Sequence, residues 1–143
     1  MSTVLHSPLH VVVGASSRDE LVCVIAEDLL CEVLKLMAER RIGAVIVVDE
    51  RGQTAGIFTE RDLLMKAADL QSLRPDTTVG ELMTRGAVSV LDATTVAETT
   101  DLMLRCGFRH LIINDRNGCP KGIVSIRDLF RVLRRAAGGE TTP

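Results

Sequence analysis

The chain of 143 residues contains no tryptophan and no tyrosine, and phenylalanine occurs only three times. Proteins that bind single-stranded nucleic acid usually stack bases on several aromatic side chains, and this sequence offers little material for such contacts. The formal net charge of -2 provides no general positive field that would attract nucleic acid or an anionic membrane. The composition therefore disfavours a nucleic-acid partner.

Cysteines are few, and their spacing matches no metal or redox motif. Cys23, Cys31, Cys106 and Cys119 form neither a C-x-x-C pair nor a zinc-finger spacing. We therefore expect thiols rather than a disulfide or a metal site. The hydrophobic content of 46% allows a core that depends on neither.

Long hydrophobic runs are also missing. The longest, over 42–48, contains a glycine and is far shorter than the roughly 20 residues that a membrane span needs. The N-terminus lacks the basic and apolar regions of a signal peptide. We expect a cytoplasmic protein with no membrane partner.

The sequence repeats itself at an offset of 66 residues. Without a gap, 13 of the 46 positions over 21–66 are identical to their counterparts in the second copy. Gly56–Leu63 aligns with Gly122–Leu129, and both copies carry a turn signal before that segment. Two copies are too few for a solenoid, so we expect two halves packed about a pseudo-twofold axis.

The periodicity within each copy predicts a β-α-β-β-α unit, and hence an α/β (α+β) fold. The continuous β-branched run over 44–48 predicts a strand buried on both faces. The domains are predicted as a first repeat with an N-terminal extension over 1–70, a linker over 71–78, a second repeat over 79–137, and a disordered tail over 138–143. The predicted elements are strands over 21–25, 44–48, 88–91, 110–114 and 121–125, a further strand ending at Thr59, and helices over 30–38, 60–68, 79–84, 95–106 and 126–136.

The residues suited to chemistry lie where the last strand of each copy becomes the last helix, at Thr59–Asp62 and Ser125–Asp128. A hydroxyl followed three residues later by an acid is close to a capping box. The same turn, at the carboxyl end of a strand, also suits a nucleotide, because a helix N-terminus attracts phosphate and an aspartate accepts ribose hydroxyls. From the residues alone both interpretations remain open.

The two Gly-hydrophobic-hydrophobic-Thr/Ser-x-x-Asp runs, Gly56–Asp62 and Gly122–Asp128, resemble the signature of the tandem cystathionine β-synthase (CBS) domain pair, or Bateman module. The resemblance covers about residues 13 to 136. It implies two related clefts between paired sheets that bind AMP, ADP or ATP, and sometimes S-adenosylmethionine or NAD. It also implies an adenine-nucleotide-binding regulatory or energy-sensing module, not an enzyme, that requires no cofactor and acts on a separate regulated protein.

The resemblance assigns residues to each cleft by position. The principal cleft would use these residues for phosphate, ribose and base: Val22, Ile42, Gly43, Arg109, His110, Ile123, Ser125, Arg127 and Asp128. A weaker cleft would use Thr59, Arg61, Asp62, Val88 and Phe108. The second set is weaker because Gly43-Ala44 occupies the positions of Arg109-His110.

Other functions were weighed against this one. A ligand-independent dimerisation module would show the same hydrophobic pattern, and helix-mediated homodimers are usual in the family that the chain resembles. The basic C-terminal helix with Arg127, Arg131, Arg134 and Arg135 could bind nucleic acid, although an ordinary solvated face explains it as well. Cys106 and His110 could suggest a nucleophile, but no third residue orients them. No P-loop or G-x-G-x-x-G motif occurs.

Overall fold

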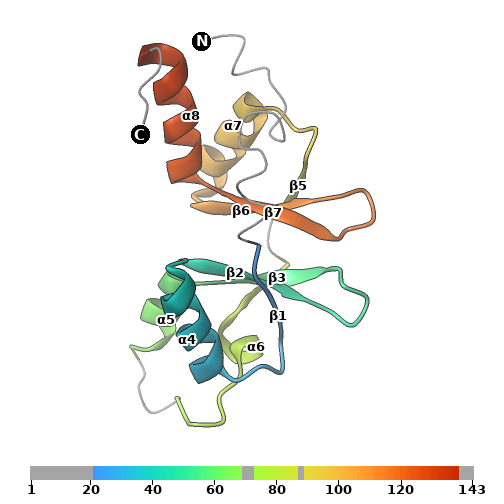
Figure 1. Ribbon diagram of the computed structural model, residues 1–143, viewed down its shortest axis with the longest axis vertical. Helices are drawn as coiled ribbons and strands as arrows, with labels where there is room; N and C mark the ends of the chain where they lie inside the picture. Colours follow the sequence, from blue (N-terminus) through green and yellow to red (C-terminus); the bar gives the residue numbers. More distant parts are fainter. Residues whose placement is uncertain (1–20, 69–72, 87–88, 139–143) are drawn as a thin grey trace. The chain divides into compact units, whose positions relative to one another are not determined.

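The computed structural model describes residues 21–68, 73–86 and 89–138 (Figure 1). The chain forms two compact units. The first unit comprises 22–87 with Gly118–Pro120, and the second comprises 88–117 and 121–143 together with the N-terminal 21 residues. The predicted N-terminal extension, most of the tail and the start of the linker lie outside the described residues.

The first unit contains a four-stranded sheet in the order β1-β2-β3-β4. The pairing of β1 with β2 is parallel, and the other two pairings are antiparallel. Its elements are β1 (Cys23–Ile25), α4 (Leu30–Arg40), β2 (Ala44–Val48), β3 (Thr54–Thr59), α5 (Glu60–Lys66), α6 (Val79–Leu82) and β4 (Thr84–Arg85). The strand β4 was not predicted, because two exposed residues give no readable alternation.

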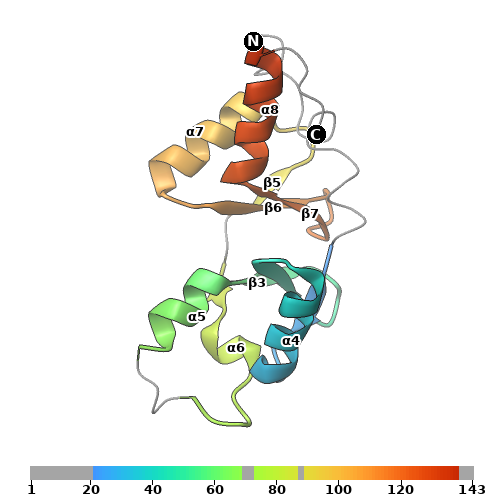
Figure 2. The same ribbon diagram turned by 60° about the vertical axis from the view of Figure 1, so that its left-hand side comes forward.

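The second unit repeats this plan with a three-stranded sheet in the order β5-β6-β7. The strands β5 and β6 are parallel, and α7 and α8 lie on the same side of the sheet (Figure 2). Its elements are β5 (Ser89–Leu91), α7 (Val96–Cys106), β6 (His110–Asn114), β7 (Pro120–Ser125) and α8 (Ile126–Gly138). The predicted β-α-β-β-α unit is therefore confirmed in both copies.

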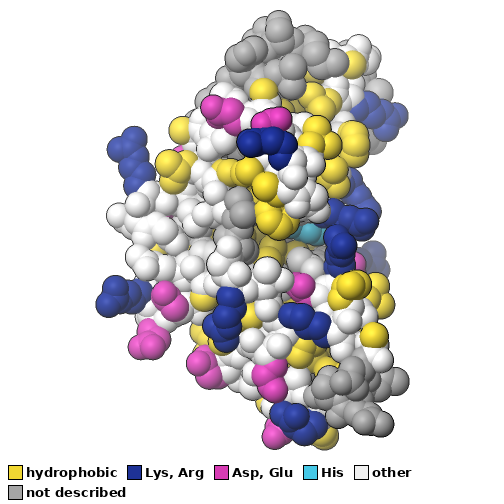
Figure 3. All heavy atoms as spheres, turned by 180° about the vertical axis from the view of Figure 1, so that it is seen from behind, with side chains coloured by type: hydrophobic (Ala, Val, Ile, Leu, Met, Phe, Trp, Pro, Cys, Tyr) yellow, Lys and Arg dark blue, Asp and Glu magenta, His cyan; other side chains and the backbone are white. Residues whose placement is uncertain are grey.

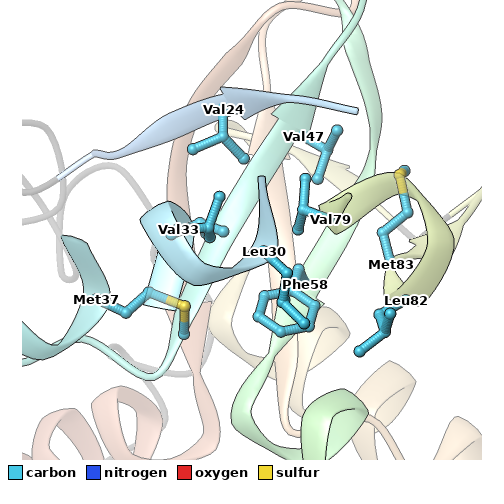
Figure 4. Packing of buried hydrophobic residues seen from close by; sticks show 10 residues of the cluster. Val24, Leu30, Val33, Met37, Val47, Phe58, Val79, Leu82 and Met83 are labelled. Atoms are coloured by element: carbon cyan, nitrogen blue, oxygen red, sulfur yellow. The ribbon is translucent and has the colours of Figure 1, made fainter. Parts of the chain in front are cut away.

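The central strand of the first unit explains why its sequence does not alternate. Residues 44–47 of β2 are all buried, which confirms a strand covered on both faces. Val45 and Val47 point to the helical side and join the core with Phe58 of β3. Figure 4 shows Phe58 among side chains from α4 and α6.

The helix α6 and the strand β4 pack on the first unit, although the sequence repeat places them at the start of the second copy. Val79, Leu82 and Met83 belong to the first core cluster. The Lys66 side chain also donates to the backbone carbonyls of Leu82 and Met83. The boundary between repeats in sequence therefore differs from the boundary between packed units, because apolar contacts decide the latter.

Capping boxes hold the starts of α6 and α7. The Thr95 amide donates to Glu98 Oε2 at 2.9 Å, and the Glu98 amide donates to Thr95 Oγ1 at 3.1 Å. The amide of Thr78 donates to Glu81 Oε2 in the same way. These backbone hydrogen bonds are the main cause that lowers the pKa of both glutamates.

Among the described residues, none of the helices combines the length and the apolar character that crossing a membrane requires. The longest of them, α8, has 13 residues, of which only Leu129 is buried.

We expect the core to tolerate truncation far less than the surface. Leu111 in β6 is 1% exposed and Leu104 in α7 is 70% exposed. Leu111→Ala should lower the free energy of unfolding by about 2–5 kcal/mol, because it leaves a cavity. The matched control Leu104→Ala should stay within about 0.5 kcal/mol of the unmodified protein. Urea titrations measure both, and equal losses would contradict the described packing.

We also expect a capping contribution that acid removes. The folded-state pKa of Glu98 lies below its unfolded value, so its carboxylate stabilises the fold at neutral pH and loses this effect as pH falls through the folded pKa. The free energy of unfolding should therefore fall less steeply between about pH 6 and about pH 3 in Glu98→Gln than in the unmodified protein. Glu81→Gln should behave alike. Denaturant titration measures the slopes, and unchanged slopes in both variants would refute this role.

Candidate functional site

The first candidate turn joins β3 to α5 and contains Thr59 and Asp62. The Thr59 amide and hydroxyl both donate to Asp62 Oδ2, at 2.9 and 3.1 Å, and the Asp62 amide donates to Thr59 Oγ1 at 3.2 Å. The Thr84 hydroxyl of β4 donates to the other oxygen, Asp62 Oδ1, at 3.0 Å. The capping box that the sequence suggested is therefore formed, and both oxygens of Asp62 accept hydrogen bonds.

The second candidate turn joins β7 to α8 and contains Ser125 and Asp128. The Ser125 amide donates to Asp128 Oδ2 at 2.8 Å, and the Asp128 amide donates to Ser125 Oγ at 3.1 Å. The other oxygen, Asp128 Oδ1, lies 3.7 Å from Arg131 Nη1, an exposed ion pair that is too long for a hydrogen bond. This turn is also a capping box, but Asp128 accepts fewer hydrogen bonds than Asp62 does.

The two aspartates differ in how many further hydrogen bonds they can accept. A carboxylate offers about four lone-pair sites. Among the described residues, donors occupy three of these at Asp62 and one at Asp128. Asp128 can therefore accept both hydroxyls of a vicinal diol without losing a contact, whereas Asp62 must release a donor.

A backbone hydrogen bond ties each turn to the residue that precedes the central strand of its unit. The Ile126 amide donates to the Arg109 carbonyl at 2.9 Å, and the Glu60 amide donates to the Gly43 carbonyl at 3.0 Å. The donors and the acceptors are each 66 positions apart, so both copies make the same contact. This contact brings the segment with Arg109 and His110 to the Ser125–Asp128 turn.

The charges brought together by this contact differ between the copies. Arg109 is exposed, and its carbonyl accepts from the amide of the apolar Ile126. In the first unit the same two positions hold Gly43 and Glu60, and a Cβ added to Gly43 would lie 3.1 Å from Glu60 Oε2. This linked pair of positions therefore carries a carboxylate in the first unit and a guanidinium in the second. The sequence analysis noted the missing Arg-His pair but overlooked Glu60, which the offset of 66 residues would have revealed.

The remaining predicted residues lie in both units. Val22 and Ile42 are half-buried and pack against the first core. Ile123 is half-buried in β7, on the sheet face opposite to the buried Val124. Phe108 is 37% exposed in the loop before β6. Arg61 and Arg127 are exposed on α5 and α8, His110 begins β6 half-buried, and Val88 lies outside the described residues.

Neither alternative chemistry gains support from the described residues. Gly107 ends α7 in the left-handed conformation, with Cys106 exposed at the helix end. The arginines of α8 are exposed, as an ordinary solvated helix face would also have them. Figure 3 shows basic and acidic side chains interspersed on one face of the molecule rather than gathered by sign.

The comparison with known families agrees with the repeated unit and its turns. The sequence model described as CBS domain matches residues 13–69 and 79–135, which is most of the chain. The chain belongs to the CBS domain family and contains two copies of the domain.

Similar proteins extend this finding. An uncharacterized 17.7 kDa protein of Acidianus ambivalens is 42% identical over 104 residues, which cover 73% of this chain and 62% of that protein. The chain therefore spans less than two thirds of that relative. An uncharacterized conserved protein of Pyrococcus horikoshii has a TM-score of 0.78 at 25% identity, with 92% and 95% of the chains covered. CBSX2, a CBS-pair protein from Arabidopsis thaliana solved in complex with AMP, has a TM-score of 0.74 at 27% identity, with 85% and 92% covered.

Proposed function

We propose that this protein binds an adenine nucleotide through the Ser125–Asp128 turn and acts as a regulatory module rather than an enzyme. The main support is the hydrogen bond between the Arg109 carbonyl and the first amide of α8. This bond holds a cationic residue next to a turn whose aspartate can still accept hydrogen bonds. The AMP complex of the similar protein CBSX2 supports the ligand class.

Each residue of the turn has a defined role in this proposal. Asp128 accepts the two ribose hydroxyls, since its Oδ1 accepts no hydrogen bond among the described residues and its Oδ2 accepts one. The Ser125 hydroxyl donates to a phosphate oxygen, because its lone pairs already serve the Asp128 amide. Arg109 pairs with the phosphate charge, with His110 and Arg127 as further donors.

The parts of the ligand beyond this turn follow the family resemblance. Ile123 of β7 is proposed to lie beside the sugar. Any of AMP, ADP or ATP fits these roles, and S-adenosylmethionine or NAD share the adenosyl group. The Thr59–Asp62 turn, with Arg61, is the weaker site, because Asp62 must give up a donor before it can hold a ribose.

Regulation in this proposal works through linkage. A ligand that binds only the folded chain stabilises it by an amount that grows with the logarithm of ligand concentration above the dissociation constant. A separate protein that recognises the liganded form would respond to that shift. No chemical step is assigned to any residue.

We expect two binding phases with AMP, and Asp128→Ala should abolish the tighter one. A charge-assisted contact such as that of Arg109 contributes about 1.5–3 kcal/mol, so the tighter phase should be about ten to a hundred times stronger than the weaker one. Asp62→Ala is the matched control and should leave the tight phase nearly intact, while losing about 1 kcal/mol of stability from its capping box. Isothermal titration calorimetry measures both variants.

Two results would count against this assignment. If Asp62→Ala removed the tight phase while Asp128→Ala spared it, the order of the two turns would be reversed. Thermal unfolding with GMP provides a second check. AMP should raise the melting temperature more than GMP, and equal shifts would rule out the proposed selectivity for adenine.

We also propose a homodimer that packs through exposed helical side chains. Leu64 and Met65 of α5 are 74% and 68% exposed, and Phe130 of α8 is 64% exposed. Large apolar side chains at such exposure are typical of an interaction surface. Other large apolar residues of the helices, such as Met37 and Leu129, are instead buried in the cores of their units.

Sedimentation velocity tests the dimer at micromolar concentration. The unmodified chain should sediment as a dimer, and Leu64→Glu should shift it toward the monomer, because the charge cannot be buried without a partner. Ala38→Glu on α4 is the matched control, because it adds the same charge at an exposed position that holds no large apolar side chain, and it should leave the sedimentation coefficient unchanged. A monomeric unmodified chain would contradict the proposal.

A further inference from the structure

We propose that Glu60 weakens the binding of nucleoside phosphates at the Thr59–Asp62 turn, so that this turn prefers adenosyl ligands without a phosphate while phosphorylated ligands prefer the Ser125–Asp128 turn. This inference rests on the proposed function and adds the ligand class that each turn selects. The proposal goes beyond the absence of an Arg-His pair from the first copy. It attributes the weaker phosphate binding to repulsion by Glu60, a residue that is present.

The position of Glu60 follows from the backbone. Its amide donates to the Gly43 carbonyl at 3.0 Å, so it is the first residue of α5 and lies beside the entry to β2. Its carboxylate fills the space that a side chain at position 43 would take, with Oε2 3.1 Å from an added Cβ. The carboxylate therefore lies beside the position that corresponds to Arg109 in the second copy.

The charged residues at the two turns therefore have opposite effects on a bound phosphate. Residues 59–62 carry two carboxylates and one guanidinium, whereas residues 125–128 carry one of each and have Arg109 beside them. A phosphate at the first turn would meet Glu60 and Asp62 together, and like charges a few ångströms apart repel even though Glu60 is exposed. The helix dipole offers little compensation, because α5 has 7 residues with two acids in its first turn.

An adenosine without phosphate avoids this repulsion. Its ribose needs only that Asp62 exchanges one donor, such as the exposed hydroxyl of Thr84, for a ribose hydroxyl. The exchange replaces one hydrogen bond by another of the same kind. Charge therefore separates the ligands of the two turns, even though both use the same Ser/Thr-x-x-Asp geometry.

Glu60→Gln in the Asp128→Ala background tests the proposal with AMP and adenosine, which differ only in the phosphate. The substitution should strengthen AMP binding by at least about fivefold by calorimetry, because it removes one repelling charge. Adenosine affinity should stay within about twofold. Glu50→Gln in the β2–β3 turn is the matched control, since it makes the same change in net charge away from the site and should alter neither affinity.

A transplant of the second copy's residues provides a gain of function. Gly43→Arg with Glu60→Ile places the Arg109 and Ile126 pair in the first unit, and a Cβ at position 43 meets only the end of the Glu60 side chain, which this variant removes. In the Asp128→Ala background this variant should bind AMP at least about tenfold more tightly than its parent. Circular dichroism confirms that each variant is folded.

The outcomes separate this inference from the proposed function. If the unmodified chain bound neither AMP nor adenosine, the proposed function would fail and this inference with it. If AMP bound through Asp128, but Glu60→Gln changed AMP and adenosine affinities equally or not at all, only the inference would be overturned. It would also be overturned if the transplanted variant, folded, bound no AMP.

Discussion

The hydrogen bond between the first amide of the last helix and the carbonyl before the central strand organises both halves of this protein. It links Glu60 to Gly43 in the first unit and Ile126 to Arg109 in the second. Because the contact involves only backbone atoms, it survives complete replacement of the side chains at all four positions. The residues at these positions therefore always lie next to the Thr/Ser-x-x-Asp turn, and their side chains set the charge around each turn.

The turns cap their helices, and in the proposed function the same side chains also bind the ligand. Each hydroxyl accepts from the amide of the aspartate, and each aspartate accepts from the amide of the hydroxyl residue. These bonds hold the side chains in fixed orientations, so a ligand would meet a preorganised group and would not have to order it. The disadvantage is that a carboxylate oxygen that already accepts hydrogen bonds within the protein is less available to a ligand. Asp62 is an example, because it accepts from the hydroxyls of Thr59 and Thr84.

Divergence between the copies has changed charge while leaving the backbone plan intact. In both units two helices, α4 with α5 and α7 with α8, lie beside one sheet, and the strands β3 and β7 end at the same kind of turn (Figure 1). Replacing Gly43 and Glu60 by Arg109 and Ile126 exchanges an acidic turn for one with a cation. A pair of duplicated domains can thus respond to two ligand classes, since selectivity between related ligands needs a repulsive element as well as an attractive one.

The amino-acid sequence by itself determined the repeated unit and most of its elements, because hydrophobic periodicity and the turn residues are local signals that both copies carry. It also identified the two turns, but it left capping and binding as equal interpretations, because one residue pattern serves both. The short strand β4 and the packing of α6 on the first unit were decided by apolar contacts with Val79, Leu82 and Met83. Only the tertiary structure placed Glu60 against Gly43 and Thr84 on Asp62. These contacts join residues 17 and 22 positions apart, and chain folding, not local pattern, brings such residues together.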